Sequence, residues 1–263
     1  MNILLIAGHG AGDVGACGNG YQEYKLTREV VNLIKPILDD YVTVDIYDQS
    51  RNAFKDVQNG KFNIGKYDYV FEVHFNAFNG KAKGSEIYVT TREKGITVEQ
   101  AIMKNMKKWF VLRDNDNIFD GVKRTNFLVI NTVKNRGMSG ALLEVCFIDN
   151  ANEMKIYQAN KEAIAKDIVD GIVKGFGLKK KASTKKPTTT KKPTTKKPTN
   201  DIKVGDKVWV TSRVSYEGVR CIEDVLKRKW TVVEIKGNRV VLGDGLNTAF
   251  HKANLKKWLN HEW

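Results

Sequence analysis

One glutamate of this sequence stands inside an otherwise apolar run. Residues 142–148 read LLEVCFI, with Glu144 in third position, and such a run is typical of a strand that is buried on both faces. A carboxylate buried there without a partner costs several kcal/mol of folding free energy. Buried acids of this kind are usually paired with a base, bound to a metal or used in catalysis, so we interpret Glu144 as a functional residue.

Two histidines and a second glutamate lie where strands are expected to end and a helix to begin. His9 stands between two glycines directly after the apolar run 3–7, His74 lies near the end of the run 67–76, and Glu23 precedes a helical pattern. Such ends meet at the carboxyl edge of an α/β sheet, where ligands usually bind. Two histidines and one glutamate can hold a catalytic zinc ion and leave a fourth position for water. A second, non-ligating glutamate is the base that such a site needs.

Each of these residues also has a structural interpretation. His9 could be a surface histidine in a turn, and Glu23 could be an acid that complements the positive end of a helix dipole. His74 could be a hydrogen-bonded structural histidine. The sequence has no His-Glu-x-x-His helix, no Gly-x-Ser-x-Gly elbow and no phosphate-binding loop. His251 and His261 lie far from these motifs, and we interpret them as surface residues.

The elements that must position these residues follow from the apolar patterns. Strands are expected at residues 3–7, 42–47, 67–76, 84–89, 127–130 and 140–148. Helices are expected after Glu23, over 98–112 and over 152–176, the last with a break near 159–160. Strands that alternate with helices predict an α/β domain over residues 1–178, an open twisted sheet with helices on both faces.

Composition divides the chain into three parts. Residues 179–200 contain nine lysines, three of the four prolines and no acid, which predicts an extended linker that buries no apolar surface. Residues 201–263 show short β-patterns and a Gly237-Asn238 turn between two of them. They predict a small all-β SH3-like barrel domain. The net charge of +14 resides mostly in these two parts, because residues 1–178 hold 23 basic and 22 acidic residues.

This charge distribution favours a nearly neutral enzyme domain tethered to a module that is attracted to an anionic surface. A nucleic-acid-binding protein that uses the lysine linker and the β-barrel is the alternative from another class. The neutral first domain and its buried Glu144 argue against that alternative. The three cysteines are odd in number and far apart, which indicates free thiols. No apolar run approaches the length of a membrane span, and Met1 leads almost directly into the first strand without an ordinary signal peptide.

Six motifs in residues 2–178 resemble the zinc-dependent N-acetylmuramoyl-L-alanine amidases of the type 3 family, in that family's order. They are Ala7-Gly8-His9-Gly10 with Asp13 and Gly15; Glu23 with Leu26-Thr27; His74-Phe75-Asn76-Ala77; Gly84-Ser85-Glu86-Ile87-Tyr88; residues 121–127; and residues 142–150. The resemblance implies that His9, Glu23 and His74 hold Zn²⁺ and that Glu144 is the catalytic acid and base.

One residue departs from the pattern of that family. Glu72 stands where the family usually has a small polar residue, two positions before the metal histidine. Alternation along a strand puts Glu72 and His74 on one face. Glu72 could therefore compete as a metal ligand or perturb Glu144.

The order of parts resembles a bacteriophage endolysin with a C-terminal SH3-like wall-binding domain. This implies hydrolysis of the amide between N-acetylmuramic acid and L-alanine in peptidoglycan, for host lysis. The expected partners are bacterial peptidoglycan and an anionic cell-wall polymer, without nucleic acid and without a membrane span. Such a protein would be made in the host cytoplasm without a signal peptide and would act on the wall after release. A host sporulation or autolytic amidase with the same chemistry is the alternative.

Overall fold

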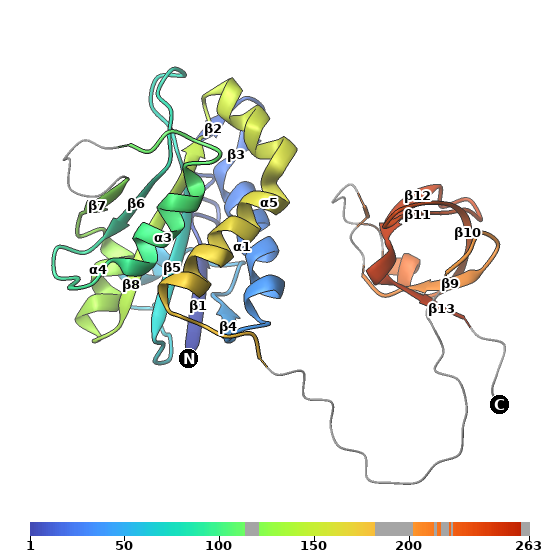
Figure 1. Cartoon of the computed structure of the whole chain (residues 1–263), viewed down its shortest axis with the longest axis horizontal. Coiled ribbons are helices and arrows are strands. Elements are labelled where there is room, and N and C mark those ends of the chain that lie inside the picture. The colour runs from blue at the N-terminus through green and yellow to red at the C-terminus, as the bar shows by residue number, and fades with distance from the viewer. Residues whose placement is uncertain (114–120, 182–201, 213–214, 217–220, 222, 259–263) are drawn as a thin grey trace, which may run out of the picture. The chain divides into compact units, whose positions relative to one another are not determined.

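The computed structural model describes residues 1–113, 121–181, 202–212, 215–216, 221 and 223–258 (Figure 1). The chain divides into two compact units, Met1–Lys186 and Pro187–Trp263. Most of the predicted linker, and His261, lie outside the described residues. Among the described residues, none forms a helix that is both long and apolar enough to cross a membrane.

The first unit is built on a six-stranded mixed sheet. Its strands in spatial order are β4 (Thr43–Ile46), β1 (Asn2–Ala7), β5 (Tyr69–Asn76), β8 (Ser139–Phe147), β6 (Glu86–Val89) and β7 (Val122–Arg124). The first four strands run parallel to one another. Strand β6 is antiparallel to β8 and parallel to β7. The carboxyl ends of β1, β5 and β8 therefore lie side by side at one edge of the sheet.

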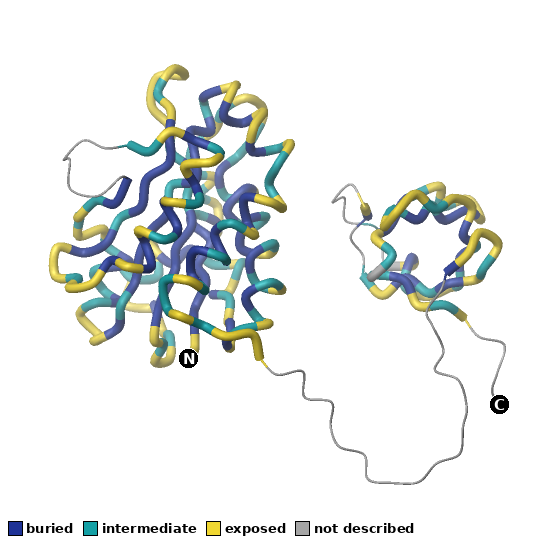
Figure 2. Tube along the Cα trace, viewed as in Figure 1, coloured by how far each residue is buried: buried dark blue, intermediate teal, exposed yellow. Residues whose placement is uncertain are grey.

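Helices cover both faces of this sheet. Helices α1 (Glu23–Leu38), α3 (Thr97–Met106) and α5 (Ala151–Gly175) share the larger apolar core, and α2 (Ala53–Gln58) and α4 (Leu128–Asn135) share the smaller one. Buried residues run along the inner strands β1, β5, β8 and β6, whereas the edge strands β4 and β7 each bury one residue (Figure 2). The prediction of an α/β sheet with helices on both faces is confirmed.

Alternation along β5 decides which face carries its polar residues. Phe71 and Val73 belong to the core under α1, α3 and α5, whereas Val70 belongs to the core under α2 and α4. Because side chains two positions apart share a face, Glu72 and His74 lie on the α2–α4 face. The carboxyl end of β5, which carries these polar residues, thus lies beside α2 and α4.

Two local predictions are wrong, and one strand was missed. Residues 127–130 were expected to form a strand, but residues 128–135 form helix α4, which buries Val129, Ile130 and Val133. Strand β7 at 122–124 was not predicted. Helix α5 shows no break near 159–160 and is continuous over 25 residues, because Met154, Tyr157 and Ile164 on either side of that point stay buried on one helix face.

The second unit is rich in β-structure. It contains a five-stranded sheet in the order β12 (Thr248–His251), β11 (Arg239–Leu242), β10 (Lys229–Lys236), β9 (Lys207–Val210) and β13 (Leu255–Lys257). Neighbouring strands are antiparallel. The hairpin turn predicted at 237–238 is confirmed, with Gly237 at φ +61°. Trp230 is buried in this unit's core, whereas Tyr216 and Trp258 are exposed.

Candidate active site

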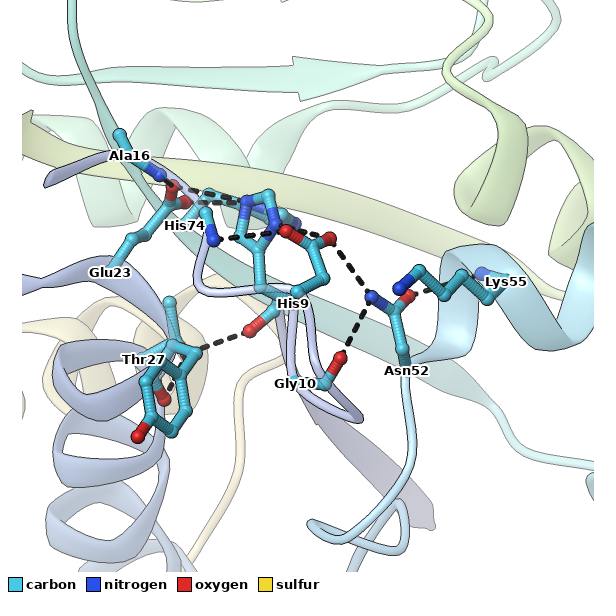
Figure 3. A network of polar contacts seen from close by, with 12 residues as sticks. His9, Gly10, Ala16, Glu23, Thr27, Asn52, Lys55 and His74 are labelled. Carbon is cyan, nitrogen blue, oxygen red and sulfur yellow. Dashed lines mark hydrogen bonds and ion pairs between the residues drawn. The ribbon is translucent and has the colours of Figure 1, made fainter.

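His9, Glu23 and His74 converge at the carboxyl edge of the sheet (Figure 3). The Nε2 atom of His9 lies 3.0 Å from one carboxylate oxygen of Glu23, and the Nδ1 atom of His74 lies 2.9 Å from the other. One ligand atom from each residue lies within 4.8 Å of the other two. Residues that are 14, 51 and 65 positions apart in the sequence thus form one cluster.

The backbone around His9 is held in an uncommon conformation. His9 has φ +62° and Gly10 has φ +103°, the left-handed region that non-glycine residues rarely adopt. The Arg28 guanidinium donates to the backbone oxygen of His9 (3.0 Å), and Thr27 and Arg28 both donate to the backbone oxygen of Gly8 (2.9 and 3.0 Å). These hydrogen bonds from α1 hold the backbone at Gly8 and His9 in the conformation that directs the His9 ring toward Glu23.

Glu23 is the most constrained member of the cluster. It begins helix α1, is 3% exposed, and its carboxylate accepts backbone hydrogen bonds from Ala16 (2.9 Å) and Phe75 (3.0 Å). Burial alone would raise the pKa of this carboxyl, but hydrogen bonds from His74 and His9 outweigh it and hold the pKa far below its ordinary value. Glu23 is therefore ionised.

The far side of each imidazole also contacts a carboxylate. Asp13 lies 3.0 Å from the Nδ1 atom of His9, and Glu72 lies 3.3 Å from the Nε2 atom of His74. Asp13 is itself held by the Gly15 amide (3.0 Å) and by the Asn52 side chain (3.1 Å; Figure 3). Neither Asp13 nor Glu72 belongs to the group of converging ligand atoms.

The surroundings of the two histidines are strongly anionic. Burial alone would lower the pKa of His74, but hydrogen bonds to Glu23 and Glu72 raise it well above the ordinary histidine value. The pKa of His9 is raised in the same way by Glu23 and Asp13, against the effect of burial. Three carboxylates around two imidazoles favour a cation between them. Two histidine nitrogens and a carboxylate oxygen are also ligand types that zinc prefers, so the residues present fit this ion.

Glu144 lies on the neighbouring strand, directly opposite His74 in the β5–β8 register. It is partly buried, and its Oε2 atom is buried without a hydrogen-bond partner among the described residues. Burial raises the pKa of Glu144 to about 8; the nearby His74 opposes this shift, and the carboxylates of Glu23 and Glu86 add to it. A carboxyl with such a pKa can take up and release a proton near neutral pH.

A groove of about 330 Å³ opens beside the cluster on the α2–α4 face. Glu72, His74 and Glu144 line it, together with His9 and Asp13. Its remaining walls are mostly apolar and come from the starts of α2 and α4 and from β8: Ala53, Phe54, Phe127, Leu128, Val129 and Leu142. A substrate in this groove would lie against both the histidine cluster and Glu144.

Two residues that contribute to the site were not singled out in the sequence for these roles. Asn52 caps α2 through the Lys55 amide (3.0 Å) and also donates to Asp13; only its capping role has a sequence signature. Glu86 is 1% exposed, lies opposite Glu144 on β6, and pairs with Lys123. Its signal was the same as that of Glu144, an acid in an apolar strand.

The raised pKa of Glu144 predicts how stability depends on pH in the metal-free protein. Between the ordinary glutamate value of 4.5 and about 8, the folded state keeps a proton that the unfolded state loses. The free energy of unfolding therefore falls as pH rises through this window. Glutamine has no carboxyl that titrates in this window. The free energy of unfolding of metal-free Glu144→Gln should therefore rise progressively relative to that of the wild type as pH is raised from about 5 to about 9. Denaturant unfolding across this range tests the shift, and a constant difference would contradict it.

Comparison with known proteins identifies the family of the first unit. Residues 3–174 match the N-acetylmuramoyl-L-alanine amidase family. The chain is 29% identical over 204 residues to the endolysin of Bacillus phage SPP1, covering 68% of each chain. It is 28% identical over 192 residues to the sporulation-specific N-acetylmuramoyl-L-alanine amidase of Bacillus subtilis, covering 70% of this chain and 71% of that one.

Among solved structures, the putative N-acetylmuramoyl-L-alanine amidase from Neisseria meningitidis superposes with a TM-score of 0.52. It is 26% identical and covers 68% of this chain and 97% of its own. The family match spans the sheet, the histidine cluster and Glu144, and it ends before the second unit. The chain belongs to the N-acetylmuramoyl-L-alanine amidase family.

Proposed function

We propose that His9, Glu23 and His74 hold one Zn²⁺ ion and that Glu144 transfers protons in a peptidoglycan amidase. As a family member, the protein hydrolyses the amide between N-acetylmuramic acid and L-alanine. The observation that supports the zinc assignment is the convergence of His9, Glu23 and His74, one ligand atom of each lying within 4.8 Å of the others, with His9 Nε2 and His74 Nδ1 on the two oxygens of an ionised Glu23. Glu144, opposite His74, supplies the separate base.

When bound, zinc polarises the scissile carbonyl and lowers the pKa of water, as in other zinc hydrolases. The chain's own residues supply the rest of the reaction. Glu144 accepts a proton from the attacking water as the C–O bond forms. It then gives that proton to the amine nitrogen as the C–N bond breaks. The products are a lactyl carboxylic acid on the sugar and an amine on L-alanine, which become a carboxylate and an ammonium group by transfer of the acid proton.

The environment of Glu144 suits both steps. A residue that acts first as base and then as acid works best when its pKa lies near the working pH. Glu144 lines the groove, and its buried Oε2 atom has no hydrogen-bond partner among the described residues, so this oxygen is not committed to another described side chain. Apolar residues from the starts of α2 and α4 line the same groove as Glu144.

Chelation and product analysis test this proposal together. Removal of metal should abolish hydrolysis, and stoichiometric zinc should restore it. Mass spectrometry of digested peptidoglycan should then show new L-alanine amino termini and intact glycan strands. Full activity after exhaustive chelation would contradict the zinc assignment, and cleavage of a glycosidic or peptide bond would contradict the reaction.

We further propose a catalytic domain over residues 1–178, a linker over 179–200 and an SH3-like wall-binding domain over 201–263. The five-stranded sheet of the second unit and its exposed Tyr216 and Trp258 support a separate binding module. The relatives include both an endolysin and a sporulation amidase. The proposed site and reaction therefore apply equally to host lysis by a phage and to wall remodelling by a bacterium. We favour the phage role because a catalytic unit, a lysine-rich stretch and a β-rich module follow one another.

Truncation should separate wall binding from catalysis. Lys180 pairs with Asp40 (2.8 Å), and Lys181 donates to the backbone oxygens of Asp39 and Val42, so the fragment should end after residue 181. We expect 1–181 to match the full chain on soluble wall fragments but to act more slowly on intact walls, because tethering raises the local substrate concentration.

Moderate salt should weaken, but not abolish, binding of the full chain to purified walls. Charges are screened beyond roughly 8–10 Å at physiological salt, whereas aromatic and polar contacts are not. Equal rates of the 1–181 fragment and the full chain on intact walls would contradict the tethering role of the second unit. Retention on nucleic acid that matches retention on walls across the salt range would favour a nonspecific cationic surface instead.

A further inference from the structure

Glu72 is a buried carboxylate for which the proposed reaction has no use. It lies in the middle of β5, two positions before His74, and is 3% exposed. One of its oxygens lies 3.3 Å from the Nε2 atom of His74. The other oxygen, Oε2, is buried without a hydrogen-bond partner among the described residues.

Such a residue is a poor choice for stability alone. A buried carboxylate is costly unless its oxygens are satisfied by donors, and Glu72 has one satisfied oxygen of two. Glu99, a second buried carboxylate at 3% exposure, shows the contrast: it lies on α3, away from the groove, and accepts a 2.5 Å hydrogen bond from the buried Tyr69 hydroxyl. Glu99 serves the core, whereas Glu72 contacts an imidazole of the proposed metal centre.

The direction of this contact gives Glu72 a specific role. The Nδ1 atom of His74 faces Glu23 and the convergence point, so its lone pair must be free for a metal there. A neutral imidazole then carries its proton on Nε2, and Nε2 faces Glu72. A carboxylate that accepts this N–H fixes both the tautomer and the orientation of the ring. Asp13 makes the corresponding contact with His9, at 3.0 Å.

We propose that Glu72 is a positioning residue that orients His74 for zinc through its Nε2–H group. The proposal rests on the metal centre proposed above and extends it to a residue outside the ligand set. The alternative, that Glu72 is itself a ligand, has less support, because Glu72 contacts the nitrogen that faces away from Glu23 and is not part of the converging group.

The test compares zinc affinity and stability in full-length variants. Glu72→Met keeps the length of the side chain and removes the acceptor. Zinc affinity, measured by competition with a chelator, should fall by about 10–100-fold. The thermal midpoint of the metal-free protein should stay unchanged or rise, because a half-satisfied buried charge is removed. Glu72→Gln keeps an acceptor oxygen and should lie between Glu72→Met and the wild type in zinc affinity.

Glu99→Met is the matched control. It removes another buried carboxylate and leaves the Tyr69 hydroxyl without its partner, so the metal-free midpoint should fall while zinc affinity stays at the wild-type value. Asp13→Asn, which also keeps an acceptor oxygen, should lower zinc affinity as Glu72→Gln does, since Asp13 contacts the other histidine. Glu72→Ala is a second test that cannot overpack the strand, and it should lose as much zinc affinity as Glu72→Met.

Three outcomes would overturn the proposal. Wild-type zinc affinity in both Glu72→Met and Glu72→Ala would show that Glu72 does not position His74. Increased affinity would show that Glu72 competes with the site. An equal loss of affinity in Glu99→Met would show a general effect of removing a buried acid. A wild-type protein that binds no zinc would instead contradict the metal centre itself, so the two failures are distinguishable.

Discussion

Glu144→Gln is expected to lower the rate of amide hydrolysis by about 10²–10⁴-fold while zinc content and fold are retained. The amide keeps the shape of the carboxyl but cannot accept the proton of the attacking water or return it to the amine. Glu144 is also not among the converging ligand atoms, so the substitution should leave the metal in place. The rate is best measured on a soluble muramoyl peptide, which avoids any effect on wall binding.

Glu99→Gln is the control for this prediction. Glu99 is buried as well but lies on the opposite side of the sheet, where it bonds Tyr69, so its conversion to glutamine should leave the rate near the wild-type value. Hydrolysis by Glu144→Gln within a few-fold of the wild type would remove Glu144 from the mechanism. Loss of zinc in this variant would show that Glu144 is a ligand and not the base.

His74→Ala should lose both zinc and activity, a larger effect than that of Glu144→Gln. The substitution removes one of three ligands and also the imidazole that bonds Glu23 (2.9 Å). The fold should persist, because His74 lies at the edge of the sheet and the two apolar cores do not include it. Metal analysis after dialysis, together with circular dichroism, measures the two expectations separately.

His251→Ala is the matched histidine control, because His251 is exposed on β12 of the second unit. It should keep full zinc content and full activity on soluble fragments. Full zinc occupancy in His74→Ala would refute the ligand assignment. Zinc loss accompanied by unfolding would contradict the expectation that the fold forms without metal.

The sheet and its site residues could be predicted because their signals are local. Buried strands appear as short apolar runs, and the parallel order of β1, β5 and β8 brings their carboxyl ends together. His9 and His74 therefore had to lie near one edge once the runs were assigned. Glu144 was detectable because a carboxylate inside LLEVCFI contradicts the burial of its neighbours.

Helix α4 was mispredicted because its first residues carry a strand-like signal. Phe127-Leu128-Val129-Ile130 is apolar and contains β-branched residues, which favours a strand in isolation. The decisive residue is Val133, since Val129, Ile130 and Val133 together form one buried helix stripe. Packing against the sheet thus overrides local propensity here.

The residues that support the site depend on long-range contacts, which a local pattern does not contain. Asn52 reaches Asp13 across 39 positions of sequence, and its own neighbourhood indicates only a helix cap. The sequence placed Glu72 on the same strand face as His74, but the nitrogen that it contacts follows from the rotation of the His74 ring, which Glu23 determines from 51 positions away. Side-chain orientation of this kind is set by tertiary structure.

Anomalous diffraction at the zinc absorption edge, on crystals of the full-length protein grown with zinc, tests the central claim most directly. The account predicts one strong peak in the first unit, about 2.0–2.2 Å from His9 Nε2, His74 Nδ1 and a Glu23 oxygen, with Glu144 beyond bonding distance. A peak held by Glu72 or Glu144 in place of one of these residues, or no peak in catalytically active crystals, would contradict it.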